Sequence, residues 1–110
     1  MRPRSKAINV IDRFEVAVET LATGPGDIRS RLLSAFISIM VFRDGDLPDE
    51  VRKDFAWVVD TLTKKEAQYP GEGRLHSTLR QMRNSTGSTV AHKIFGIYKR
   101  LLFLSQDGAT

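Results

Sequence analysis

The sequence has no cysteine among its 110 residues, which excludes disulfide bonds and thiolate metal sites. Its longest apolar stretch, residues 32–42, is interrupted by Ser34 and Ser38 and is too short to cross a bilayer. The N-terminal residues lead into an amphipathic segment that lacks the unbroken apolar core of a secretory signal. We therefore expect a soluble, cytoplasmic protein with a single helical domain over residues 1–110, ordered at about 5–105.

Acidic residues are missing from a long part of the chain. Between Gly73 and Gln106 there is no Asp or Glu, although this segment contains six Lys and Arg residues. Residues 44–72, in contrast, contain eight acidic and four basic residues, and the whole chain has a formal net charge of +4. A stretch of one sign attracts a polyanion or an acidic protein surface, so the C-terminal third is the candidate binding region.

The sequence also lacks the alternation of apolar and polar residues that is typical of a half-buried strand, and helical periodicity dominates instead. Gly24-Pro25-Gly26 ends the first helix, and Asp27 suits the N-cap of the second. The periodicity predicts helices at about 5–23, 28–42, 48–67, 74–84 and 89–104. We expect an all-α fold, a compact four- or five-helix bundle whose last two helices form a helix–turn–helix pair.

Residues 28–42 form the most apolar of these helices, with apolar side chains around most of its circumference. We therefore expect it to be the most deeply buried element. Ser30, Ser34 and Ser38 follow one another at intervals of four and form a narrow stripe of small side chains. Such a stripe favours close approach of a neighbouring helix.

Cations on the last two predicted helices form a candidate nucleic-acid-binding surface. The segment 84–88 is rich in Ser, Thr and Gly and is expected to form the turn between these helices. Within it, Thr86 and Ser88 would bind a phosphate at the N-terminus of the last helix. This last helix would act as the recognition helix. The side chains expected to neutralise phosphates are Arg80, Arg83, Lys93, Lys99 and Arg100.

Two alternatives remain open. Trp57 and Phe103 fall on polar faces of their helices, so they would instead dock the chain on another protein, or on a second copy in a homodimer. Alternatively, the acidic residues of the third helix would form ion pairs with the basic residues of the last two helices, and the charges would be neutralised within the protein. The candidate pairs join Asp54, Asp60 or Glu66 to Arg80, Arg83 or Arg100.

Residues typical of catalysis or metal binding are scarce. His76 and His92 are far apart in sequence, and neither has an acidic neighbour that would complete a metal site. The segment 85–89 lacks the GxxxxGK[ST] spacing of a phosphate-binding loop. We therefore expect a non-catalytic regulatory or accessory protein, with no metal, cofactor, small-molecule substrate or membrane partner.

Overall fold

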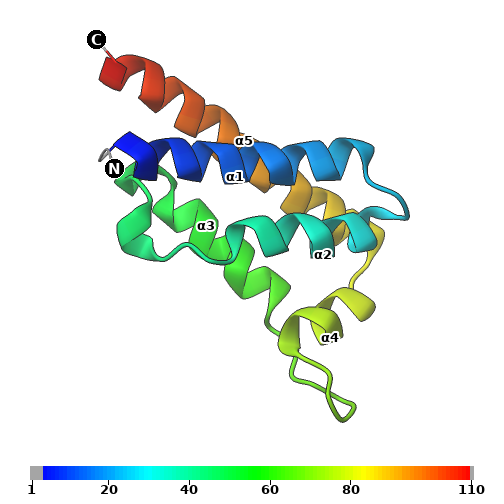
Figure 1. The fold of residues 1–110 in the computed structure, drawn as a ribbon. Helices are drawn as coiled ribbons and strands as arrows, with labels where there is room; N and C mark the ends of the chain where they lie inside the picture. The colour runs from blue at the N-terminus through cyan, green and yellow to red at the C-terminus, as the bar shows by residue number, and fades with distance from the viewer. Residues whose placement is uncertain (1–3, 110) are drawn as a thin grey trace.

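The computed structural model describes residues 4–109, and the side chains of residues 9–106. Within this part of the chain it contains helices and no strand, which confirms the all-α bundle expected from the sequence (Figure 1). The elements are α1 (Arg4–Thr23), α2 (Ile28–Ile39), the 3-10 helix η1 (Asp44–Asp46), α3 (Asp49–Leu62), α4 (Arg74–Arg80) and α5 (Asn84–Ala109).

The long helices pack around a single apolar core. α1 and α2 lie side by side, and α5 runs behind them and packs against α1, α2 and α3 (Figure 1). The start of α1 and the end of α5 lie at the same end of the molecule, and the last turns of α5 extend past the other helices (Figure 1). This arrangement leaves one side of α5 facing solvent.

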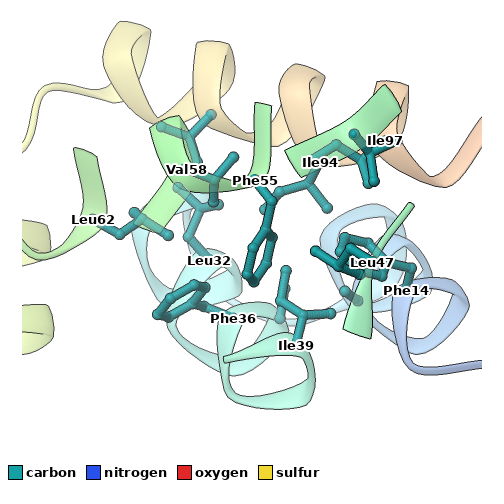
Figure 2. Packing of buried hydrophobic residues seen from close by; sticks show 14 of the residues in the cluster. Phe14, Leu32, Phe36, Ile39, Leu47, Phe55, Val58, Leu62, Ile94 and Ile97 are labelled. Atoms are coloured by element: carbon teal, nitrogen blue, oxygen red, sulfur yellow. The ribbon is translucent and has the colours of Figure 1, made fainter. Parts of the chain in front are cut away.

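Phe14 of α1 lies at the centre of the core and is completely buried. Its ring stacks on Phe42 with 6.1 Å between centroids, and it meets Phe55 edge-on at 6.0 Å. Figure 2 shows Phe14 and Phe55 among aliphatic side chains from the surrounding helices. Burying each such side chain stabilises the fold by about 1.5–3 kcal/mol. The other labelled core residues are Leu32, Phe36, Ile39, Leu47, Val58, Leu62, Ile94 and Ile97.

Among the described helices α2 has the smallest share of exposed residues, as predicted, but it is not buried all round. Ile37, and Met40 and Val41 just after the helix, are each more than half exposed. The reason is geometric, because α1, α4 and α5 pack against α2 while the stripe through Ser30, Ser34 and Ile37 stays exposed in the described part of the chain. Ser30 and Ser34 are also exposed, whereas Ser38 is half-buried beside Arg13 of α1, so only the last serine of the stripe lies against a neighbouring helix.

The third helix ends at Leu62, five residues earlier than predicted. Side chains of α4 hold the backbone that follows it. Arg74 donates from Nε to the carbonyl oxygen of Thr63 at 2.7 Å, and Ser77 donates from Oγ to that of Glu66 at 2.7 Å. The hydroxyl oxygen of Thr78 accepts the N–H of Lys65 at 2.9 Å. These bonds give partners to backbone N–H and C=O groups that a longer α3 would have paired within the helix.

The predicted turn at residues 84–88 is also wrong, since this segment forms the first turns of α5. The chain instead turns at residues 81–83, where Arg29 donates from Nη1 to the carbonyl oxygens of Arg80 and Met82 at 3.5 and 3.4 Å. Gly87 is buried against α2, and a Cβ at this position would lie 3.0 Å from Cγ2 of Ile28. The glycine that looked like a turn residue therefore allows two helices to approach closely.

Candidate polyanion-binding site

One side of helix α5 is buried in the core, and the opposite side faces solvent. Val90, Ile94, Ile97 and Leu101 repeat at helical spacing and are all at most 5% exposed. Because these residues face the core, those on the opposite side of the helix must face solvent. Six residues on this side together line a shallow hollow of about 370 Å³. We call them the α5 outward face: His92, Phe95, Gly96, Lys99, Arg100 and Phe103.

Two aromatic rings flank two cations on the α5 outward face. Phe95 and Phe103 are 44% and 50% exposed, which is unusual for phenylalanine. Nζ of Lys99 lies 5.4 Å from the ring centroid of Phe95, and Cζ of Arg100 lies 5.4 Å from that of Phe103. Both distances are within cation–π range. A Cβ at Gly96 would meet no atom within 4 Å, so the space between these pairs is open.

The two cations of this face are not neutralised within the described part of the chain. Neither Lys99 nor Arg100 forms an ion pair with a carboxylate among residues 9–106. No Asp or Glu occurs between Gly73 and Gln106, so α5 supplies no acidic neighbour over this length. The face therefore presents positive charge and apolar ring surface together.

Arg80, predicted to contact phosphate, is held by the protein itself. Its Nε lies 2.8 Å from Oε2 of Glu72, and its Nη2 lies 3.1 Å from Oε1 of the same carboxylate. The hydrogen bond from Arg80, followed by that from the N–H of Gln68, lowers the pKa of Glu72 from 4.5 to about 2. Cζ of Arg80 also lies 4.7 Å from the ring centroid of Tyr69.

Lys93 and Trp57 form a contact between α5 and α3. Nζ of Lys93 lies 3.5 Å from Oδ1 of Asp54 and 5.6 Å from the centroid of the Trp57 ring. Trp57 is 39% exposed, so one part of its ring remains accessible to a partner. The pair of Lys93 with Asp54 is an internal ion pair between the acidic and the basic segments. Neither Arg83 nor Arg100, which were candidates for such pairing, is joined to a described carboxylate.

Arg83 and Thr86 lie away from the α5 outward face, at the beginning of α5. They line a separate hollow together with Lys64 and Lys65. Ser88 is exposed in the second turn of α5, so it does not belong to an inter-helix turn as predicted. The seven predicted binding residues are therefore distributed over several places and do not form one surface.

Sequence reasoning missed three residues of these surfaces. Phe95 is absent from the predicted binding residues, although its position four residues before Lys99 and eight before Phe103 places all three on one side of a helix. Lys64 and Lys65 were treated as part of the third helix. Nothing in the local sequence could have placed them beside Arg83, because that proximity depends on how α4 packs.

No protein-family model matches this chain, and no curated protein and no solved structure is significantly similar to it. Among the described residues, no helix combines the length and the apolar character required to cross a membrane. Nor do the described residues contain a group of three His, Asp or Glu side chains arranged to hold a metal ion. Function must therefore be inferred from the chemistry of the surfaces described above.

Proposed function

We propose that this protein binds single-stranded nucleic acid, without catalysis, through the α5 outward face. The observation that carries the proposal is that two exposed aromatic rings lie beside two cations that no described carboxylate neutralises. Proteins that bind single strands combine these two elements, since cations follow the phosphates and rings stack on unpaired bases.

Each side chain of the face has a role in this proposal. Lys99 and Arg100 neutralise phosphates, and Phe95 and Phe103 provide stacking surfaces. The two rings are eight residues apart, which corresponds to about 12 Å along a helix. This separation is larger than the spacing of about 3.4 Å between stacked bases in a strand, so each ring would receive a different, non-adjacent base.

A single strand is favoured over a duplex by two features. The bases of a duplex are already stacked on one another, so exposed phenylalanine rings gain little from contact with it. In a DNA-reading helix–turn–helix, the first helix crosses the backbone while the second enters the major groove. Here α4 packs on α2 and α3 and has seven residues, so it offers α5 little support for that geometry.

Fluorescence anisotropy of a labelled oligonucleotide, measured over a range of salt concentrations, tests the proposal. The logarithm of affinity should fall linearly with the logarithm of salt concentration. Replacing Lys99 and Arg100 together by Gln should lower the magnitude of this slope by about 1.4, since each phosphate contact of a single strand contributes about 0.7. A matched double replacement of Arg43 and Lys53, which are exposed elsewhere, should leave the slope nearly unchanged.

The outcome that rejects the proposal is the absence of saturable binding to DNA and RNA single strands at low salt. A second rejecting outcome is an equal loss of affinity in both double variants. That result would mean that the net charge of the protein, rather than the α5 outward face, attracts the oligonucleotide.

Docking on a protein is the second candidate function, and the exposed end of α5 favours it. Leu102 and Phe103 are 37% and 50% exposed where the helix extends past the bundle, and Trp57 is 39% exposed on α3. Large apolar side chains in such positions are enriched at interfaces, either with an acidic partner or with a second copy. Sedimentation tests the homodimer: Phe103→Ser should dissociate it, and a strict monomer at high protein concentration would exclude it.

A further inference from the structure

A small hollow lies where the end of α3, the turn before α5 and the first turn of α5 meet. Its volume is about 290 Å³. We call it the junction pocket. Three cations line it, and its other lining residues contribute three hydroxyl groups, one amide and one thioether, but no carboxylate. The lining residues are Thr61, Lys64, Lys65, Thr78, Gln81, Met82, Arg83 and Thr86.

The charges of the junction pocket are not neutralised by the described part of the protein. Lys64, Lys65 and Arg83 form no ion pair with a carboxylate among residues 9–106. All three side chains are exposed, so they are free to turn toward an anion in the hollow, and no acidic residue among its lining competes with that anion.

A second, larger hollow of about 470 Å³ provides the contrast. Cations line this hollow too, namely two arginines, but each of them is paired with a carboxylate. Arg29 lies 3.1 Å from Asp27, and Arg80 lies 2.8 Å from Glu72. The N–H of Ser30, followed by the side chain of Arg29, lowers the pKa of Asp27. The arginines of the larger hollow therefore already have anionic partners, whereas the cations of the junction pocket have none among the described residues.

Hydrogen-bond donors are also present in the junction pocket. Thr78 is 3% exposed, and its hydroxyl oxygen accepts the N–H of Lys65 at 2.9 Å. Among the described residues this hydroxyl group donates no hydrogen bond, so its proton remains available. Asn84 begins α5 next to the pocket, and the first N–H groups of an α-helix have no acceptor within the helix.

We propose that the junction pocket binds a phosphate group, either free or as the monoester of a small molecule or of a nucleic-acid end. A guanidinium group, two ammonium groups and hydroxyl donors match the oxygens of a phosphate, and Arg83 can contact two of them at once. The volume is near the lower limit of small-molecule pockets, roughly 300–1,000 Å³. The pocket therefore has room for a phosphate and a small attached group.

This site goes beyond the proposed function, because none of its residues belongs to the α5 outward face. Arg83 and Thr86 receive a role here that is separate from the stacking surface of Phe95 and Phe103. The double replacement of Lys99 and Arg100 by Gln should therefore leave phosphate binding intact. Failure of one proposal can then be recognised independently of failure of the other.

Titration of the protein with inorganic phosphate, followed by amide NMR spectra, tests the site. The expected result is saturable shifts concentrated at Lys65, Thr78 and residues 83–86. Arg83→Gln should weaken binding about tenfold or more, since a hydrogen bond to a charged group contributes roughly one decade of affinity. Lys53→Gln, an equal charge change on α3 away from the pocket, should have no comparable effect.

Two outcomes overturn the proposal. One is a set of shifts that grow linearly with phosphate and are spread over all basic residues. The other is an equal effect of Arg83→Gln and Lys53→Gln. Because Lys64, Lys65 and Arg83 are not part of the apolar core, the variants should remain folded, and thermal unfolding of each variant verifies this.

Once phosphate binding is established, its source can be identified with three further probes. A nucleoside monophosphate is compared with two oligonucleotides that differ only in a 5′-phosphate. If the pocket receives a nucleic-acid end, the 5′-phosphate should raise affinity, and Arg83→Gln should abolish the increase. If it receives a small molecule, the monophosphate should bind in competition with inorganic phosphate, and the 5′-phosphate should make no difference.

Discussion

Arg80 donates two hydrogen bonds to the carboxylate of Glu72, from Nε to Oε2 at 2.8 Å and from Nη2 to Oε1 at 3.1 Å. The same guanidinium group donates to Oε1 of Gln68 at 3.2 Å and lies over the ring of Tyr69. Arg80 therefore joins α4 to the connection that precedes it. A residue that appears in the sequence as one more basic side chain of the C-terminal third is thus structural.

The first prediction concerns the pH dependence of stability. The pKa of Glu72 is about 2 in the folded protein and near 4.5 without its partners. Because the folded pKa is depressed, the carboxylate contributes stability above about pH 4.5, and this contribution is lost as the pH falls toward 2. Glu72→Gln should be less stable than the wild type at pH 6, and the difference should shrink toward pH 2.5. Urea unfolding at the two pH values measures it, and a constant difference would contradict the assignment.

The second prediction concerns the core. Phe14→Ala should lower the free energy of unfolding by about 3–5 kcal/mol, because the ring is completely buried between Phe42 and Phe55. Val16→Ala is the matched control on the same helix; this residue is 49% exposed, and the change should cost less than about 0.5 kcal/mol. Equal losses in the two variants would contradict the packing shown in Figure 2.

The third prediction compares two glycines of α5. Gly96→Ala should stabilise the protein by about 0.5–1 kcal/mol, because alanine favours the helix and a Cβ there meets no atom within 4 Å. Gly87→Ala should give a smaller gain or a loss, since its Cβ would lie 3.0 Å from Cγ2 of Ile28. Thermal unfolding of the two variants provides the comparison. A larger gain at position 87 than at position 96 would show that α5 and α2 are less closely packed than described.

The fourth prediction concerns the aromatic rings of the α5 outward face. Phe95→Leu and Phe103→Leu should each weaken binding of a single strand about tenfold, since stacking contributes roughly 1–3 kcal/mol per base. The salt dependence should not change, because neither substitution removes a charge. Trp57→Leu removes an exposed ring outside this face and is the control. If it weakens binding as much as the other two, the nucleic acid lies on α3 and α5 together.

The helices follow from the sequence because their apolar periodicity is local. The first helix ends at Thr23 as predicted, since Gly24-Pro25-Gly26 cannot continue it. The predicted C-terminal end of the third helix and the predicted start of the last helix were wrong for a common reason. Local composition around Thr63 and Gly87 is compatible with more than one backbone path, and long-range contacts select one of them.

Both proposed binding surfaces draw on the C-terminal third of the chain. The absence of acids after Gly73 directs attention to that segment, because charge composition can be read without knowledge of the fold. Which cations remain unpaired could not be predicted. Arg80 meets Glu72 through the folding of a connection, and Lys93 meets Asp54 through the packing of α5 on α3.

Residue type and local spacing were enough to predict the class of fold and the sign of the charge in each segment. Which charges are neutralised, which aromatic rings stay exposed, and where three cations line one hollow without an acid follow only from the packing of the helices. Ion pairs and exposure depend on distances across the bundle. Those distances are set when Phe14 and its neighbours pack, and no short window of sequence contains them.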